Sequence, residues 1–268
     1  MPDKREHRGR HPADAALFAA DKLPALREAL ADFSLLLSKG YADKSALKLV
    51  GDRFGLTQRQ RLAVMRSACS DAQRQSRLAR RVAIGALPGR TLAIDGYNLL
   101  ITIEAALSGG LIFRGRDGCF RDLASIHGTY RKVEETVPAL ARIGAFLAEI
   151  GIAEARWLLD SPVSNSGRLK TLLTDLAQER HWPWTVRLSL NPDAELRGQW
   201  TVDSSPSPAH GQPPTDNCQL TTENRPRPPI VVTTDSVVLD ACGHWTNLAA
   251  EIITRHLPDA TVIDLAPS

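Results

Sequence analysis

The chain of 268 residues is 43% hydrophobic and carries a formal net charge of +3 at pH 7, which suits one or two soluble domains with real cores. It contains no long apolar run, so no transmembrane helix is expected, and the charged residues 1–10 lack the apolar core of a secretory signal. The four cysteines are scattered without a Cys-x-x-Cys pair, which argues against a zinc knuckle or a disulfide framework. A reducing cytoplasm is the expected location.

The charge is unevenly distributed along the chain. Residues 1–90 contain 18 lysines and arginines against 9 aspartates and glutamates, whereas residues 91–268 contain 15 against 21. A basic N-terminal part joined to an acidic C-terminal part indicates that the two parts have different functions. The charge of the basic part favours a polyanionic partner. A solvated helical surface would give the same charge pattern, so this alternative stays open.

The N-terminal part is predicted to be helical. We expect residues 1–21 to form a flexible basic tail and residues 22–88 to form a small all-α domain, in which residues 25–37 carry apolar side chains at helical spacing. Residues 45–54 and 58–67 have the pattern of two further helices. Gly55 would supply the tight turn between these helices, and Thr57 would cap the second.

The second helix of this pair carries arginines that a helix-turn-helix would present to a phosphate backbone, namely Arg59, Arg61 and Arg66. Residues 73–81 add a basic stripe. The alternative for this region is a small helical bundle, or an arm that packs on the second domain, with the stripe as a solvated helix face.

From residue 91 onward strands and helices alternate, which predicts a parallel sheet with helices on both faces. Residues 198–229 are rich in Pro, Ser, Thr, Gln and Asn, and we expect them to form a disordered surface insertion within this α/β domain of residues 91–268. The predicted strands are 91–95, 155–160, 184–190, 230–235 and 261–265, and the predicted helices are 99–107, 137–150, 168–180 and 246–256.

Three of the predicted strands end on an aspartate, at Asp95, Asp160 and Asp235. Parallel α/β sheets place their ligand sites beyond the carboxyl ends of the strands, so these carboxylates could converge on one hard cation. Each aspartate also suits a turn or a helix cap, and that structural role is the alternative. The neighbours that would support the site are Asn98, Glu104, Ser236 and Asp240.

A second group of side chains has the chemistry to contact phosphate or a base. Ser164, Asn165 and Ser166 would cap the helix after the second strand and leave backbone N–H groups facing an anion. The segment 121–132 adds Arg121, His127, Tyr130 and Arg131. An imidazole such as His127 titrates near neutral pH and would also serve as a general acid or base. Hydrogen bonds that hold this loop together would explain the same residues.

Asp95-Gly-Tyr-Asn98, the strand ending at Asp160, and the strand ending in Thr-Thr-Asp235-Ser together resemble the PIN-like nucleases, especially their NYN branch. With the segments 121–132 and 160–167, the chain resembles more closely an uncharacterised two-domain family. The short N-terminal helical domain of that family, of unknown function, corresponds to about residues 22–81 here.

The resemblance implies a PIN-like three-layer sandwich with a five-stranded parallel sheet in the order 3-2-1-4-5. Asp95 and Asp235 would then be neighbours, and Asp160 would lie one strand away. The resemblance also implies that these carboxylates hold Mg²⁺ or Mn²⁺ and that a metal-bound water attacks the phosphodiester. NYN-type enzymes usually carry an acidic helix after the third strand. The match in this region is poor, and Asp193 or Glu195 would have to substitute for it.

We therefore predict a metal-dependent endoribonuclease with an N-terminal nucleic-acid-binding domain, acting on RNA or else on DNA. The alternatives are a protein that binds nucleic acid without cutting it, and a nucleotide phosphohydrolase on the same scaffold. Salt-sensitive RNA binding without metal dependence would favour the first alternative, and activity on nucleotides but not on oligonucleotides would favour the second. No membrane partner is expected, and the sequence does not predict the oligomeric state.

Overall fold

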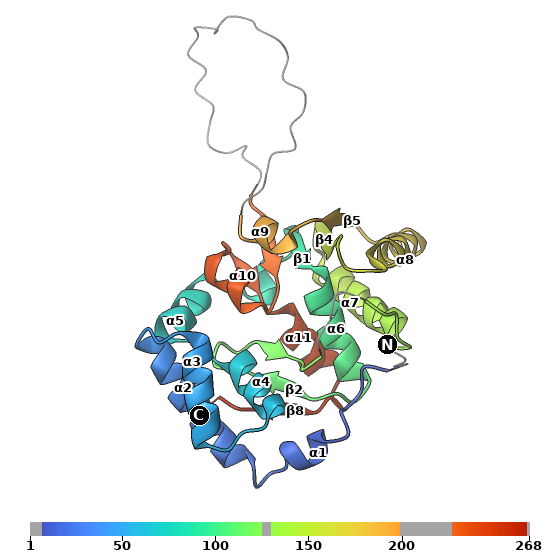
Figure 1. Ribbon diagram of the computed structural model, residues 1–268. Coiled ribbons are helices and arrows are strands. Elements are labelled where there is room, and N and C mark those ends of the chain that lie inside the picture. The colour runs from blue at the N-terminus through green and yellow to red at the C-terminus, as the bar shows by residue number, and fades with distance from the viewer. Residues whose placement is uncertain (1–6, 125–129, 199–226, 267–268) are drawn as a thin grey trace, which may run out of the picture.

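The computed structural model describes residues 7–124, 130–198 and 227–266, and its N-terminal part is helical (Figure 1). The predicted helices of this part are confirmed, with small differences at their ends. The helices are α1 (Asp14–Leu17), α2 (Leu23–Ser38), α3 (Asp43–Arg53), α4 (Gln58–Ser67) and α5 (Asp71–Arg80), and a short 3₁₀ turn follows at Ile84–Ala86.

The unit formed by α3, a turn and α4 is confirmed together with its local signals. Gly55 takes φ +58°, a left-handed conformation that glycine adopts without a steric penalty. The hydroxyl of Thr57 accepts from the amide of Gln60, and the side chain of Gln60 accepts from the amide of Thr57. This capping box satisfies two backbone donors at the start of α4, so the helix begins at the residue that the sequence predicts.

The expectation of a flexible tail over residues 1–21 is wrong for the part that the structure describes. Phe18 is buried and packs edge-on against Phe113, with the ring centroids 4.9 Å apart. Asp14 is also buried and pairs with Arg59 of α4. A buried ring and a buried ion pair tie this segment to the body of the protein. Residues 1–6 lie outside the described residues.

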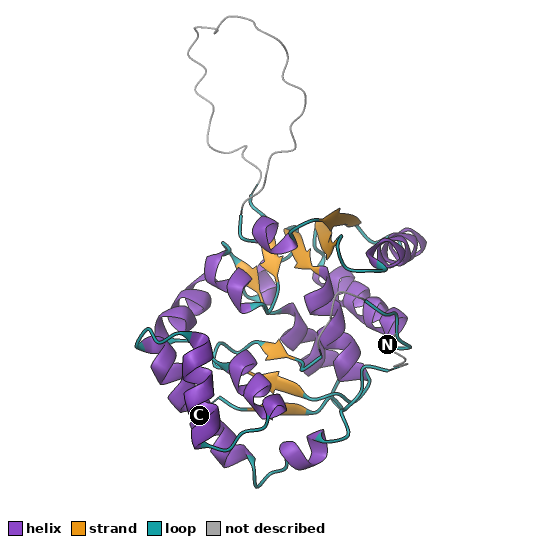
Figure 2. Ribbon diagram, in the orientation of Figure 1, coloured by secondary structure: helices purple, strands orange, loops and turns teal. Residues whose placement is uncertain are grey.

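The second part of the chain is an α/β fold, in which helices surround the strands (Figure 2). Its main sheet is five-stranded and all-parallel, in the order β5-β4-β1-β6-β7. The first strand in the sequence therefore lies in the middle of the sheet. The strands are β1 (Thr91–Asp95), β4 (Glu154–Asp160), β5 (Trp184–Ser189), β6 (Ile230–Val232) and β7 (Trp245–Thr246), and the helices are α6 (Gly96–Leu107), α7 (Thr136–Ile150), α8 (Ser166–Glu179), α9 (Pro192–Leu196), α10 (Ser236–Ala241) and α11 (Leu248–His256).

The predicted strand 261–265 is present, but its assignment to this sheet is wrong. The segment β8 (Val262–Asp264) pairs instead with β2 (Ile112–Arg114), in a separate three-stranded sheet that also contains β3 (Phe120–Arg121). The edge of the main sheet is taken by β7, which the sequence placed at the start of a helix. The reason is tertiary, because Ile263 and Leu265 are buried in the same core cluster as apolar residues of α2, α3 and α4.

Side chains of the main sheet alternate between two cores. In β1, Leu92 and Ile94 belong to the large core with α6, α7 and α11, whereas Ala93 belongs to a smaller core with α9 and α10. The helices α9 and α10 were not predicted, because each is too short to show helical periodicity. Most of the predicted insertion, residues 199–226, lies outside the described residues.

The helical part and the α/β part share one of the hydrophobic cores. Phe33 of α2 and Val64 of α4 are buried in one cluster with Phe113 of β2 and with Leu123. The boundary predicted near residue 90 therefore separates two regions of sequence that pack into a common interior. In the described part of the chain, no helix is both long and apolar enough to cross a membrane.

Candidate functional site

The ends of β1 and β6 are joined by hydrogen bonds through Thr233. The hydroxyl of Thr233 donates to Asp95 Oδ2 at 2.8 Å and accepts from the amide of Asp235 at 3.0 Å. Asn98 adds a second link, because its Oδ1 accepts from the amide and the hydroxyl of Thr234, at 2.8 and 3.0 Å. The parallel pairing of β1 with β6 thus brings Asp95 and Asp235 to the same edge of the sheet.

Gly96 allows the chain to turn directly from β1 into α6. A Cβ atom at this position would lie 2.9 Å from the carbonyl oxygen of Leu158 and 2.5 Å from the side chain of Leu159, so a larger residue does not fit without movement. The helix α6 starts earlier than predicted because the side chain of Asp95 caps it, accepting from the amide of Asn98. Asp95 is therefore a helix cap as well as a candidate site residue.

Four aspartates lie at this edge of the main sheet, and their charges influence one another's pKa values. We call this edge, with its four carboxylates, the aspartate edge. Asp95 ends β1, Asp160 ends β4, Asp193 lies in α9, and Asp235 follows β6. Burial is the largest cause of the raised pKa of Asp160, and the charge of Asp193 adds to it. The pKa of Asp193 is raised by partial desolvation and then by the charge of Asp235, while Arg197 opposes the rise. Asp193, which the sequence offered as a substitute for the missing acidic helix, thus interacts with the other carboxylates.

Asp95 is the most strongly perturbed member of this group. Burial raises its pKa from 3.8 to about 7, the Thr233 hydroxyl opposes the rise, and the charges of Asp193 and Asp235 add to it. At neutral pH this carboxyl is close to its titration midpoint. A nearby positive charge would favour the ionised form, so the group is sensitive to a bound cation.

The oxygen atoms at this edge suit a hard cation in their chemistry, but they do not form a closed cage. Within the described ranges, no three His, Cys, Asp or Glu side chains are grouped so that they could hold a metal ion, so Asp95, Asp160 and Asp235 do not form the expected ligand set. Asp235 Oδ1 is already used to cap α10, accepting from the amides of Val237 and Val238. Mg²⁺ usually retains several waters and needs only one or two carboxylates, so the donors present still fit it.

Three carboxylates that the sequence proposed as support have partners of their own. Glu195 pairs with Arg187, and Asp240 pairs with Arg77 of α5. Glu104 lies fully buried on α6 and pairs with Arg8. Supporting roles in the aspartate group are therefore left to Asn98 and Thr233, of which the sequence identified the first.

Glu104 is held by three donors inside the core. The hydroxyls of Thr136 and Tyr130 each donate to its Oε1 at 2.6 Å, and Arg8 donates to its Oε2. Burial raises the pKa of Glu104, and Arg8 and the two hydroxyls oppose that rise. We expect Glu104→Gln to lower the free energy of unfolding by about 1–3 kcal/mol, because glutamine has a single acceptor oxygen and at least one of the three donors then faces an amide nitrogen. Urea unfolding measures this, and an unchanged midpoint would contradict it.

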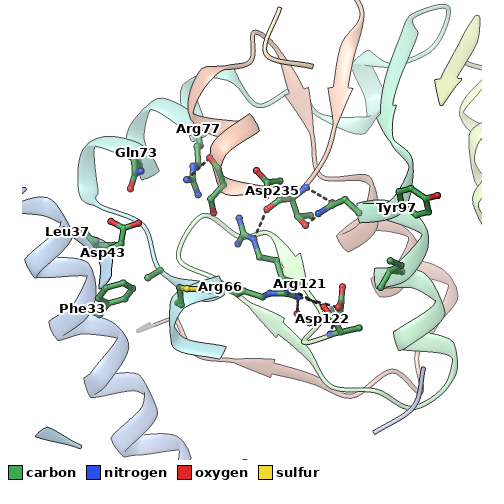
Figure 3. Close-up of a pocket in the computed structure, with 17 residues that line it drawn as sticks. Phe33, Leu37, Asp43, Arg66, Gln73, Arg77, Tyr97, Arg121, Asp122 and Asp235 are labelled. Atoms are coloured by element: carbon green, nitrogen blue, oxygen red, sulfur yellow. Dashed lines mark hydrogen bonds and ion pairs between the residues drawn. The ribbon is translucent and has the colours of Figure 1, made fainter. Parts of the chain in front are cut away.

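A cavity of about 540 Å³ lies between the helical part and the aspartate edge, with Asp235 in its wall (Figure 3). Arg77 and Arg121 line it as well, but both guanidinium groups bind Asp117, which is 1% exposed. Arg121 also donates to the carbonyl of Thr234 at 2.7 Å. Arg121 is thus a buried structural residue and not the exposed phosphate contact that the sequence suggested.

The arginines of α4 are also engaged within the chain. Each guanidinium group pairs with a carboxylate, and the partner of Arg66 lies in the α/β part of the chain. The partners are Asp14 for Arg59, Asp52 for Arg61, and Asp122 with the Ala124 carbonyl for Arg66.

A second cavity, of about 380 Å³, gathers several of the predicted phosphate contacts at the start of α8. It is lined by Arg131, Lys132 and Arg168, together with Asn165 and the buried Tyr130, whose hydroxyl donates to Glu104 and not into the cavity. The side-chain amide of Asn165 donates to the carbonyl of Tyr130 at 2.9 Å, which fixes one wall to the other. The side chains of Lys132 and Arg168 were not singled out from the sequence, because only the fold brings these two segments together.

The remaining predicted contacts have other surroundings. Ser166 is buried, and its hydroxyl donates to the carbonyl of Ser161 at 3.3 Å. The carbonyl of Ser164 accepts from the amide of Tyr130 at 3.1 Å, and the side chain of Ser236 lines the first cavity. His127 lies outside the described residues.

Comparison with known proteins gives relatives without an assigned activity. A family described as a domain of unknown function (DUF5616) matches residues 84–208, and a family described as a protein of unknown function (DUF434) matches residues 25–80. An uncharacterized protein of Methanocaldococcus jannaschii is 28% identical over 183 residues, which cover 68% of this chain and 88% of that protein. No solved structure matches the chain.

Proposed function

We propose that this chain is a metal-dependent ribonuclease with a PIN-like α/β domain. The observation that carries the proposal is the placement of Asp95, Asp160, Asp193 and Asp235 at one edge of a parallel sheet. Carboxylates that repel one another in a partly buried site cost folding free energy unless a cation neutralises them. Their position at the carboxyl end of the strands, where α/β folds bind ligands, favours a bound cation with a catalytic use.

The donors favour Mg²⁺ or Mn²⁺, because carboxylate and amide oxygens are the ligands that these ions prefer. Asp95 and Asp235 would hold the ion from neighbouring strand ends, and Asp160 and Asp193 would hold its water ligands. When bound, such an ion makes a water more acidic and neutralises charge on a phosphate. Thr233 orients Asp95 by donating to its Oδ2.

The second cavity supports a polyanionic substrate. Arg131, Lys132 and Arg168 line it, and the short segment 160–165 connects it to Asp160. Cationic side chains near a carboxylate edge can hold the phosphates on either side of the one that is cut. The order of β5, β4, β1 and β6 is also the order expected of the first four strands in a PIN-like sheet.

The proposal is tested by incubating the full-length protein with Mn²⁺ and a set of single-stranded and structured RNAs. We expect cleavage that requires the metal and that falls at least 100-fold in Asp95→Asn, because the substituted amide cannot carry the negative charge that binds the ion. Asp175→Asn, an exposed carboxylate on α8, is the matched control and should cleave at the wild-type rate.

Intact RNA at every Mn²⁺ concentration would overturn the nuclease assignment. Salt-sensitive RNA binding in that case would point to a nucleic-acid-binding protein. Hydrolysis of mononucleotides without cleavage of oligonucleotides would point to a phosphohydrolase.

A further inference from the structure

Two arginines of α5, in the N-terminal part, donate hydrogen bonds to the short helix α10, which begins directly after Asp235. Arg77 donates through Nε to Asp240 at 2.7 Å and through Nη2 to the carbonyl of Ser236 at 3.3 Å. Arg80, one turn further along α5, donates to the carbonyls of Leu239, at 2.8 Å, and of Cys242. Both ends of α10 are therefore fixed by arginines of one helix.

The backbone on each side of Asp235 is held by a buried guanidinium group. Arg121 donates to the carbonyl of the preceding residue at 2.7 Å, and Arg77 to that of the following residue. Asp117 links the two arginines, accepting from Arg77 Nη1 at 2.6 Å and from Arg121 Nη2 at 2.7 Å. Because one carboxylate fixes both planar guanidinium groups, the backbone of residues 234–236, to which they donate, has little freedom to move.

The position of the Asp235 carboxylate depends on this segment of backbone. Its Oδ1 accepts from the amides of Val237 and Val238, and its own amide donates to Thr233. A shift of the start of α10 would therefore move the carboxylate relative to Asp95, whose Oδ2 accepts from the same Thr233 hydroxyl.

We propose that Arg77 is a positioning residue for Asp235, acting through Asp117, Arg121 and the backbone of α10. The N-terminal helical part is then a component of the catalytic unit, and its α5 sets the geometry of the aspartate edge. This inference rests on the proposed function for its consequence on catalysis, but the positioning itself can be measured without any catalysis.

The experiment combines amide hydrogen exchange with a Mn²⁺ titration of RNA cleavage, on the full-length protein. In Arg77→Lys we expect the amides of Val237 and Val238 to exchange at least 10-fold faster. We also expect half-maximal cleavage to need several-fold more Mn²⁺, with the KM for RNA unchanged. Asp240→Asn removes the negative charge of an exposed partner of Arg77 and should change both quantities in the same direction by a smaller factor. If Arg77→Lys does not fold, Asp240→Asn tests the inference by itself.

Arg116→Gln is the matched control. Arg116 pairs with Asp71 at the start of α5 and donates to the carbonyl of Cys69, so its side-chain partners lie away from residues 234–236 in the sequence. A lower melting temperature with unchanged exchange at Val237 and Val238 is expected for it. Unchanged exchange and unchanged Mn²⁺ requirement in folded Arg77→Lys and in Asp240→Asn would overturn the inference. Faster exchange in a protein whose wild type cleaves no RNA would uphold the positioning and overturn the nuclease assignment alone.

Discussion

Asp117→Ala is expected to lower the free energy of unfolding by about 3–5 kcal/mol at neutral pH, because it leaves the buried Arg121 without a carboxylate partner and leaves Arg77 with Asp240 alone. Asp117 and Arg77 are each 1% exposed, and Arg121 is 5% exposed. Burial alone would raise the pKa of Asp117, but the charges of Arg121 and Arg77 outweigh it and hold the pKa well below the ordinary value. Urea unfolding of wild type and variant gives the difference.

The pH dependence of this effect follows from the sign of the shift. A carboxyl whose folded pKa is depressed contributes stability that is present above its unfolded pKa and is lost as the pH falls through the folded value. The difference between wild type and Asp117→Ala should therefore shrink in acid. Asp175→Ala, at an exposed position, should stay within about 0.5 kcal/mol of wild type. A loss below about 1 kcal/mol for Asp117→Ala would contradict the proposed buried network.

Asp95→Asn is expected to have the opposite sign and to stabilise the metal-free protein by about 2–4 kcal/mol at about pH 8. The folded pKa of Asp95 is raised from 3.8 to about 7, with burial as the largest cause. The folded protein therefore binds this proton more tightly than the unfolded chain does. The resulting penalty develops as the pH rises from about 4 to about 7 and is fully present above that range. Unfolding measured at about pH 5 and about pH 8 separates the two regimes.

At millimolar Mn²⁺ we expect the wild type to be more stable than Asp95→Asn. A cation at the aspartate edge stabilises the ionised carboxylates of the wild type, and ligand binding to the folded state alone raises the melting temperature. Asp95→Asn should gain much less from the ion than the wild type does. Equal Mn²⁺ shifts in the two proteins, or no stabilisation of the variant at about pH 8, would contradict the role given to Asp95.

Much of the candidate site was predictable because its signals are local. A short apolar strand that ends in Asp-Gly or Thr-Asp gives the position of Asp95 or Asp235 in any parallel sheet, since the carboxyl ends of such strands face the same edge. Asp193 was a sequence candidate for a different reason, because the resemblance to NYN-type enzymes implies an acidic helix after the third strand. The basic character of α5 was also visible, but a sequence cannot distinguish a solvated arginine from a buried one such as Arg77.

The sequence by itself determined most of the helices, the positions of four strands of the main sheet and the capped turn at Thr57, because residues close together in the chain mark each of these elements. The tertiary structure alone decided that β8 joins a second sheet, that Phe18 anchors the N-terminal segment, and that Asp117 unites Arg77 with Arg121. Each of these depends on which distant surfaces bury one another. A short strand or a charged side chain is compatible with several partners until the shared core selects one.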